Sequence, residues 1–370
     1  MGRHNFTIDQ EGGISRRRFL SLTAAGAAGL ALGACSKKNP AAPAPIDETP
    51  RTARVAVGEI GTYEKTVLKK KLIDMLDALG GLGDLIKSGD KVGLKINLTG
   101  GSGSANQWQR STGVSALESF WTHPNVVQVM GELAKDAGAG KIFILEAYYD
   151  NESISKFGFV GVANALGGQI INLNNTSPFS DYAVRPVGEK SFIYKSLYQN
   201  AIFEELDCFI SLPKAKQHVS AGVTHAMKNL VGTLPQPKYS LNGSGNRAAI
   251  HNHSAVLDKN ANSNLCRVVL DINSATKIHL AVTDAVKTTI GGEGPWCSTM
   301  ENRTFNRLIV SRDVVAADTI ATQVIGFNPN APDYTDTFAL PSPACINYLR
   351  EAERIGLGVN DLSRIEVIQL

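Results

Sequence analysis

The residues with the clearest capacity for chemistry lie in one stretch, "FISLPKAKQHVSAGVTHAMKNLVG" (209–232), which holds three Lys, two His and an Asn. Lys ammonium groups attract anions, and a buried Lys beside a carboxylate can act as an acid/base pair because burial and charged neighbours move both pKa values. Solvated loop charges are the alternative interpretation. The gathering of cations in a chain whose net charge is only +3 favours a ligand pocket.

The segment around this stretch would place its cations at the end of a strand. The apolar run "DCFISL" (207–212) predicts a buried strand that stops at Pro213. If the chain stays extended after Pro213, the two-residue period of a strand puts Lys214, Lys216 and His218 on one side. These three side chains are therefore candidate ligands for an anion.

A helix is predicted next, over 220–232, with Ser220 as its N-cap and an apolar stripe for the core. Its N-terminus would point beyond the strand end, where the helix dipole and free backbone N–H groups can hold an anion. Polar residues four apart on its other faces are Thr224 with Lys228 and His225 with Asn229. A hydrogen-bonded helix histidine is the alternative interpretation of His225.

Other polar residues follow predicted strands elsewhere in the chain: Lys95, Asn97, Glu146, Asp284 and Asp313. Because the carboxyl ends of parallel strands meet at one edge of a sheet, a shared pocket is expected there. Turns and helix caps are the alternative, and Asp313, directly before a helical segment, fits an N-cap best. The catalytic candidates are Lys95, Glu146, Lys214, His218 and Asp284.

A metal site is a weaker hypothesis. His251 and His253 form an H-x-H pair, which can chelate a metal together with a third ligand. The candidates for that third ligand are His218, His225 and Glu146. Solvated or hydrogen-bonded histidines are the alternative, and the sequence defines neither a metal nor a cofactor.

The cysteines beyond Cys35, at positions 208, 266, 297 and 345, are spaced too widely for a zinc or iron–sulfur cluster. Cys208 lies in an apolar run, so it is expected to be a buried free thiol. One or two disulfides are compatible with an oxidising compartment, and the spacing does not select a pairing.

Short β-branched runs bounded by turn residues predict buried strands at 53–59, 91–98, 141–147, 169–173, 207–212, 278–284 and 307–313. Helix-period segments are 63–79, 124–137, 220–232, 314–325 and 342–355. The alternation predicts an α/β fold with a mostly parallel sheet and flanking helices.

Two Gly/Asn/Ser-rich stretches, 99–121 and 235–254, are expected to be long pocket-forming loops, with disorder as the alternative. The sequence "GGEGP" (291–295) lacks the spacing of a P-loop and predicts a tight turn near the pocket.

The N-terminus has the features of an export signal. Arg16 and Arg17 belong to a twin-arginine pattern, and residues 32–35 resemble a lipobox that ends at Cys35, the lipidation site. The apolar run 20–33 is too short for a membrane anchor, which needs about 20 apolar residues. The expected organisation is a signal peptide over 1–34, a flexible tether over 35–52 and one α/β domain over 53–370, on the periplasmic side of a membrane.

The charge balance bears on the class of partner. Residues 1–34 hold four arginines and two acids, so the rest of the chain has 33 basic and 32 acidic residues. A protein that neutralises phosphates along a nucleic acid needs a strong excess of positive charge. A nucleic-acid partner is therefore not expected.

The motifs of this body resemble those of the DUF362 family of uncharacterised bacterial and archaeal proteins. The resemblance rests on "LPKAKQH" and "THAMKNLVGTLP", preceded by "KVGLKINL" and followed by "LAVTDAVKTTIGGEGP", and it covers most of 53–330. Ile96 and Ala285 stand where the family usually has Pro and Gly. The resemblance implies no established activity, and the ferredoxin-like Cys module of some members is absent here.

The function expected from these features is that of an exported protein that binds an anionic small molecule or cofactor at the strand ends, with or without catalysis. The ligand-binding candidates are Lys95, Asn97, Lys214, Lys216, His218, Thr224, Lys228 and Asn229. Its other partners would be the twin-arginine export machinery and the membrane that takes up the lipid on Cys35. A non-catalytic lipoprotein that assembles or delivers something for an envelope redox system is one alternative, and a metal-dependent enzyme is the other.

Overall fold

The computed structural model describes residues 52–240, 247–251, 263–331 and 346–370. The predicted signal peptide, nearly all of the predicted tether and His253 lie outside these residues, and so does the side chain of His251. Within the described ranges, no helix combines the length and apolar character needed to cross a membrane.

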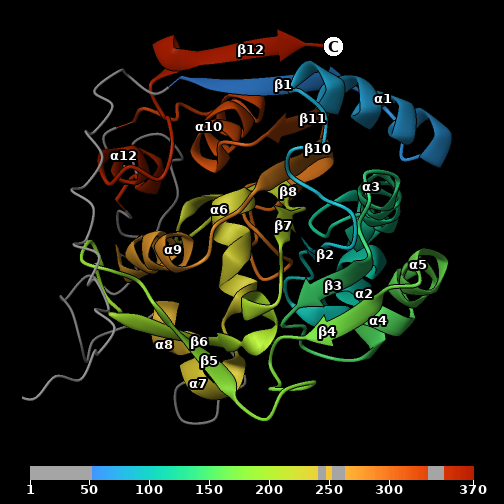
Figure 1. The fold of residues 1–370 in the computed structure, drawn as a ribbon. Coiled ribbons are helices and arrows are strands. Elements are labelled where there is room, and N and C mark those ends of the chain that lie inside the picture. Colours follow the sequence, from blue (N-terminus) through green and yellow to red (C-terminus); the bar gives the residue numbers. More distant parts are fainter. Residues whose placement is uncertain (1–51, 241–246, 252–262, 332–345) are drawn as a thin grey trace, which may run out of the picture. The chain divides into compact units, whose positions relative to one another are not determined.

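Ten strands of the described chain form one sheet. They are β1 (Ala53–Glu59), β2 (Lys91–Lys95), β3 (Lys141–Glu146), β4 (Gln169–Asn172), β7 (Cys208–Ser211), β8 (Lys214–His218), β9 (Gly222–Thr224), β10 (Leu280–Ile290), β11 (Glu301–Ser311) and β12 (Ile365–Gln369). The main order is β12-β1-β11-β10-β7-β2-β3-β4, and β8 pairs with β10 and β9 (Figure 1). β11 runs antiparallel to both neighbours, whereas β7, β2, β3 and β4 are parallel throughout. The predicted α/β fold with a mostly parallel sheet is confirmed.

Helices cover both faces of this sheet (Figure 1). One face carries α1 (Lys65–Ala78), α3 (Pro124–Asp136) and α5 (Phe159–Leu166), and the other carries α9 (Ser263–Ala275), α10 (Val314–Val324) and α12 (Tyr348–Arg354). Along β3, Ile142 and Ile144 face the first set, while Phe143 and Leu145 face the second. A strand buried on both faces needs apolar residues at every position, which is why these strands are continuous apolar runs.

Two predicted helix starts are confirmed. α3 begins with Pro124 at its first turn, and His123 Nδ1 accepts a hydrogen bond from the Asn125 backbone N–H. Asp313 caps α10 by accepting from the Ala316 backbone N–H at 3.0 Å. Backbone N–H groups in the first turn of a helix have no partner within the helix. Pro has no such N–H to leave unpaired, and the short side chain of Asp can accept from one of them. The role of Asp313 as a cap is therefore structural.

The prediction of one helix over 220–232 is wrong. This segment forms β9, then α6 (Ala226–Asn229) and the 3-10 helix η3 (Leu230–Thr233), and Ser220 is not a helix cap. The chain turns back after β8 so that Lys216 pairs with Thr224. A buried strand end with unpaired backbone groups is unfavourable, and the short antiparallel pairing of β9 supplies partners that a helix from Ser220 would leave missing.

The stretch 99–121, predicted as a long loop, is instead mainly helical, with α2 (Gly101–Thr112) and the 3-10 helix η1 (Ala116–Glu118). Ala105 and Trp108 on α2 are buried in the core, and this burial outweighs the low helix propensity of the Gly and Ser residues around them. The second stretch, 235–254, contains α7 (Gln236–Tyr239) and α8 (Ala248–His251) where it is described.

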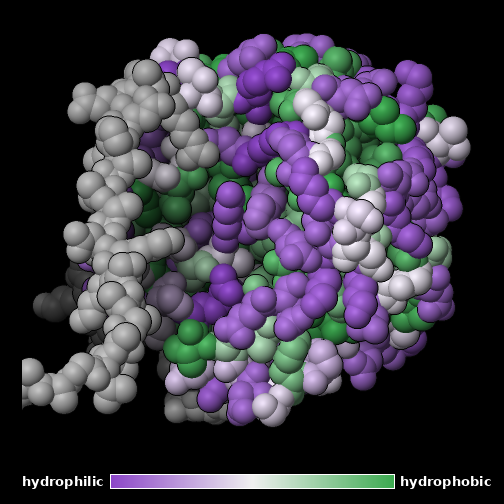
Figure 2. Space-filling view, in the orientation of Figure 1, coloured by the Kyte–Doolittle hydropathy of each residue, from purple (hydrophilic) through white to green (hydrophobic). Residues whose placement is uncertain are grey.

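The remaining elements are α4 (Glu152–Ser155), the 3-10 helices η2 (Ala201–Glu204) and η4 (Leu362–Arg364), and a hairpin of β5 (Tyr182–Pro186) and β6 (Ser196–Asn200). The hairpin pairs antiparallel in a separate two-stranded sheet. On the face drawn in Figure 2, hydrophilic side chains predominate over the helices α1, α3 and α5. This face therefore presents mainly polar groups to solvent, as expected for the outer side of amphipathic helices.

Candidate functional site

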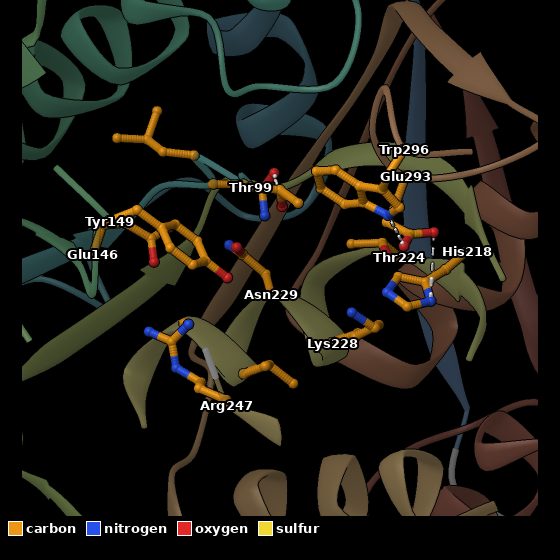
Figure 3. A pocket seen from close by; sticks show the side chains of 14 residues that line it. Thr99, Glu146, Tyr149, His218, Thr224, Lys228, Asn229, Arg247, Glu293 and Trp296 are labelled. Carbon is orange, nitrogen blue, oxygen red and sulfur yellow. Dashed lines mark hydrogen bonds and ion pairs between the residues drawn. The ribbon is translucent and has the colours of Figure 1, made fainter. Parts of the chain in front are cut away.

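A pocket of about 120 Å³ lies at the carboxyl ends of the parallel strands β2 and β3, beside β8 and β9 (Figure 3). Its wall is made by Asn97, Leu98, Thr99, Glu146, Tyr149, His218, Thr224, Lys228, Asn229, Val231, Gly232, Arg247, Glu293 and Trp296. This is the edge at which ligands bind in open α/β sheets.

The floor of the pocket contains a buried ion pair. Lys95 at the end of β2 donates to Glu146 at the end of β3 over 2.9 Å, and their side chains are 0% and 7% exposed. Lys95 Nζ also donates to the Ile96 carbonyl and to Asn229 Oδ1. Burial lowers the pKa of Lys95, and the Glu146 carboxylate acts against that shift. With three acceptors, the Lys95 ammonium group is fully committed to holding the floor.

Gly232 makes this floor sterically tight. A Cβ atom at Gly232 would lie 2.3 Å from Glu146 Oε1 and 2.7 Å from Lys95 Nζ. The Gly232 carbonyl also accepts from the Ala147 backbone N–H at 3.0 Å. Only glycine permits this approach of backbone to ion pair, which explains the Gly at the end of the "MKNLVG" sequence.

Lys228 contributes a cation of a different kind. Its side chain faces the pocket and is 7% exposed, and its Nζ forms no hydrogen bond or ion pair with any residue in the described part of the chain. Burial, with added repulsion from Arg247 and Lys95, lowers the pKa of Lys228 to about 8, although Glu293 opposes the shift. Beside it, the Thr224 hydroxyl is buried and also lacks a hydrogen-bond partner among the described residues.

A buried carboxylate, that of Asp318, holds the short helix α6 in place. Asp318 on α10 accepts from the Ala226 and Met227 backbone N–H groups at 2.8 and 2.9 Å. Burial raises the pKa of Asp318 to about 8, against the effect of these two donors. This contact fixes the first turn of α6 and therefore the direction in which Lys228 points.

Another part of the pocket wall, with Glu293 and Trp296, comes from the turn after β10. Glu293 accepts from the Val219 backbone N–H at 3.0 Å and from Trp296 Nε1 at 2.9 Å, and it lies 3.8 Å from His218 Nδ1. His218 Nδ1 in turn accepts from the Ser220 backbone N–H. The prediction that "GGEGP" is a turn near the pocket is confirmed.

Arg247 closes the pocket on the side of β3. Its guanidinium donates to the carbonyls of Leu234 and Ala147 and lies over the Tyr149 ring, 5.9 Å from the ring centre. In Figure 3, Tyr149 and Trp296 lie on opposite sides of the pocket, with Asn229 between them. The two aromatic rings thus flank a space lined by two cations, Lys228 and Arg247, and two carboxylates, Glu146 and Glu293.

Lys216 lies behind the pocket wall and not in it. Its Nζ donates to Asn97 Oδ1 at 2.9 Å, to Thr99 Oγ1 at 3.3 Å and to the Phe120 carbonyl at 2.8 Å. Burial, followed by repulsion from Lys228, lowers the pKa of Lys216 to about 7. Lys216 therefore positions Asn97 and Thr99, both of which line the pocket.

Lys214 and Asp284 form a second cluster, away from the pocket wall. Lys214 Nζ donates to Asp284 Oδ2 at 2.6 Å, to Tyr63 Oη at 2.8 Å and to the Leu117 carbonyl. Tyr63 donates to the other Asp284 oxygen at 3.0 Å and stacks on His123 with ring centres 4.0 Å apart. Burial lowers the pKa of Lys214 and raises that of Tyr63 well above its ordinary value. This cluster is internally satisfied.

The structure brings together six of the predicted site residues in the pocket wall: Asn97, Glu146, His218, Thr224, Lys228 and Asn229. Lys95 lies directly behind Glu146, and Lys216 lies directly behind Asn97 and Thr99. The expectation that Lys214 and Asp284 share this pocket is wrong because they bind each other and Tyr63 instead. His225 is buried, and its Nε2 lies 3.2 Å from Thr322 Oγ1 rather than facing the pocket.

The sequence interpretation missed the ligand potential of Tyr149, Arg247, Glu293 and Trp296. Glu293 lay within a turn that was placed near the pocket, and Arg247 lay within a stretch expected to form a pocket.

For metals, no group of three or more His, Cys, Asp or Glu ligands occurs among the described residues. Cys208 is a buried free thiol as predicted, and burial raises its pKa to about 12. Cys266 is in a disulfide.

Comparisons with known proteins agree with the resemblance of the motifs. Residues 92–323 match the family described as "Domain of unknown function (DUF362)". A thylakoid-associated protein of Synechocystis sp. is 27% identical over 271 residues, which cover 72% of this chain and 73% of that protein. A crystal structure of a Thermotoga maritima protein has 13% identity and a TM-score of 0.39, and the match covers 72% of this chain and 60% of that chain. Since the family match covers more than half of the sequence, the chain belongs to the DUF362 family.

Proposed function

We propose that this protein binds a small anion, a carboxylate or phosphate compound, in the pocket at the carboxyl ends of β2 and β3. The observation that carries the proposal is the Lys228 ammonium group, which faces the pocket without a partner in the described part of the chain. Removing an ammonium group from water without a partner is unfavourable by several kcal/mol. An anion in the pocket supplies the partner.

The balance of charges supports an anionic ligand. The wall holds two cations, Lys228 and Arg247, and two carboxylates, Glu146 and Glu293, and the buried Lys95 behind Glu146 brings the sum of the five groups to +1. Glu146 is already committed to Lys95, which leaves Glu293 facing two cations. At close range in a partly desolvated pocket, this excess attracts a negative charge more strongly than it would in water.

Hydrogen-bonding capacity points the same way. The Thr224 hydroxyl is buried, lines the pocket and has no partner among the described residues. A hydroxyl can donate to an anionic oxygen, and a buried donor left unpaired is unfavourable by about 1–3 kcal/mol. Binding an anion would therefore satisfy both Thr224 and Lys228.

Isothermal titration calorimetry with inorganic phosphate and with pyruvate tests the proposal. We expect Lys228→Met to weaken the affinity for the anion that binds by about tenfold or more, which corresponds to about 1.4 kcal/mol. Lys141→Met is the matched control, because Lys141 is exposed at the amino end of β3, the opposite end from the pocket. Equal affinities of the wild type and Lys228→Met would overturn the proposal.

We also propose that the protein is exported by the twin-arginine route and held on the periplasmic side of a membrane by lipid on Cys35. Arg16, Arg17 and the lipobox over 32–35 support this. The Synechocystis relative is named for its association with thylakoids, which fits a membrane-attached protein. Cys35→Ser should abolish labelling with a radioactive fatty acid and move the protein to the soluble fraction; a labelled Cys35→Ser protein would contradict it.

A further inference from the structure

The four buried lysines of the site region differ in how their ammonium groups are used. Three of them, Lys95, Lys214 and Lys216, each donate to three acceptors. Lys228 donates to none in the described part of the chain, and it alone of the four lines the pocket. A lysine fixed on a short helix, facing a pocket and free of hydrogen bonds, is the arrangement of an amine that reacts with its ligand.

We propose that Lys228 forms an imine with a small anion that carries an aldehyde or ketone group, such as a 2-oxo acid. This inference deepens the proposed anion binding and rests on it. The anionic group would be attracted by the pocket cations, chiefly Arg247, while the carbonyl carbon faces Lys228.

The amine must be neutral to attack a carbonyl. Burial and repulsion from Arg247 and Lys95 lower the pKa of Lys228 to about 8, so a useful fraction is neutral near pH 7. The Glu293 carboxylate, which also lines the pocket, acts against this shift, so the charged form stays populated as well.

The step is balanced without any further reagent. The neutral Nζ attacks the carbonyl carbon, one Nζ proton is transferred to the carbonyl oxygen, and a carbinolamine forms. The C–O bond then breaks as the remaining Nζ proton is transferred to that oxygen, water leaves, and a C=N bond to Nζ remains. Glu293 and His218 both line the pocket, and either can relay these protons, while the unpartnered Thr224 hydroxyl can donate to the carbonyl oxygen.

Reductive trapping tests the imine on the full-length protein. Glyoxylate with sodium cyanoborohydride, at limiting reagent, would convert an imine into a stable carboxymethyl group that intact-protein mass spectrometry detects. We expect one carboxymethyl group per chain, located on Lys228 by peptide sequencing, and its loss in Lys228→Met. Lys141→Met should keep the adduct, since Lys141 is exposed at the other end of β3.

A charge-conserving variant separates the two proposals. Lys228→Arg keeps a cation but cannot form an imine, so it should retain at least part of the calorimetric binding of glyoxylate while losing the adduct. If the wild type binds glyoxylate or pyruvate yet gives no adduct, or one spread evenly over exposed lysines, the imine is overturned and anion binding stands. If the wild type neither binds these anions or phosphate nor forms the adduct, both proposals fail.

Discussion

Lys214 and Lys228 are both buried lysines close to one edge of the same sheet, yet their surroundings differ. Lys214 is enclosed by Asp284, Tyr63 and the Leu117 carbonyl, which match its three N–H donors. Lys228 is nearly as buried, but it faces the pocket, where Glu293 attracts it and Arg247 and Lys95 repel it, and among the described residues its Nζ has no hydrogen-bond acceptor. The number of buried cations therefore does not locate a site. A site is indicated by a buried cation whose N–H donors lack acceptors inside the protein.

The two environments have opposite consequences for stability. A buried pair that satisfies itself holds the fold together, although it need not add net stability relative to apolar residues. An unpaired buried charge is unfavourable in the folded state, so it persists at the expense of stability. The Lys214 cluster is therefore the structural region, and the Lys228 pocket is the region in which function would outweigh stability.

The largest effect should come from breaking the Lys214 cluster. Lys214→Met leaves Asp284 buried with only the Tyr63 hydroxyl and the Val286 backbone N–H as donors. We expect the free energy of unfolding to fall by about 3–5 kcal/mol, because an uncompensated buried carboxylate remains. Urea denaturation followed by circular dichroism measures this change.

The double variant Lys214→Met with Asp284→Asn is the control for that experiment. The Asp284→Asn change removes the charge that needs compensation, yet the amide carbonyl of the new side chain can still accept from Tyr63, so most of the lost stability should return. A double variant that is less stable than Lys214→Met alone would show that Asp284 acts through its other contacts rather than through the ion pair.

The next effect has the opposite sign. Burial lowers the pKa of Lys228 to about 8 in the folded protein, from 10.5. Below about pH 8 the folded state must hold a charge that it disfavours, so Lys228→Met should be more stable than the wild type, by at most about 3 kcal/mol. Between these two pKa values the unfolded chain binds the proton more strongly, so wild-type stability should rise with pH relative to the variant.

Urea unfolding of both proteins at about pH 7 and about pH 10 checks this sign. Most other titrating groups are the same in both proteins and largely cancel in the difference. Lys216 does not, because repulsion from Lys228 contributes to its lowered pKa of about 7, and that pKa should rise in the variant. A stability difference that stays constant over this range would mean that Lys228 is not perturbed, and the contrast with Lys214 would disappear.

A smaller effect should follow from the carboxylate that faces Lys228. Glu293→Gln removes the negative charge that competes with an anionic ligand and keeps a carbonyl to accept from either Val219 or Trp296. We expect phosphate or pyruvate to bind more tightly by about threefold to tenfold, or about 1 kcal/mol. Calorimetry that shows weaker binding would instead indicate that Glu293 contacts the ligand directly.

Much of the fold was predictable because buried parallel strands leave a simple pattern. β2, β3 and β7 are short apolar runs followed by polar residues, and their parallel order brings Lys95, Glu146 and Ser211 to one edge. The Pro at the start of α3 and the Asp before α10 marked helix starts for local reasons. Pro has no N–H to leave unpaired in the first turn, and the Asp carboxylate accepts from a backbone N–H of that turn.

What sequence patterns could not give was the choice between equivalent local structures. The 222–229 segment fits a helix by spacing, but its pairing with β8 and the contact from Asp318, 92 residues from Ala226, select a strand and a short helix. Likewise, the three lysines at 214, 216 and 228 look alike in the sequence, and local patterns do not predict which of them find hydrogen-bond acceptors inside the protein. Those outcomes depend on contacts distant in sequence, which override local propensity.

The smallest effect is expected where a lysine pairs with a carboxylate in water. Lys70 and Asp74 lie 3.2 Å apart on α1, four residues from each other, with 80% and 41% of their side chains exposed. Solvent screens this pair, so Lys70→Ala should change the free energy of unfolding by no more than about 0.5 kcal/mol. Urea denaturation alongside Lys214→Met makes the measurement, and a change as large as in Lys214→Met would show that burial and hydrogen bonding do not distinguish the lysines of this protein.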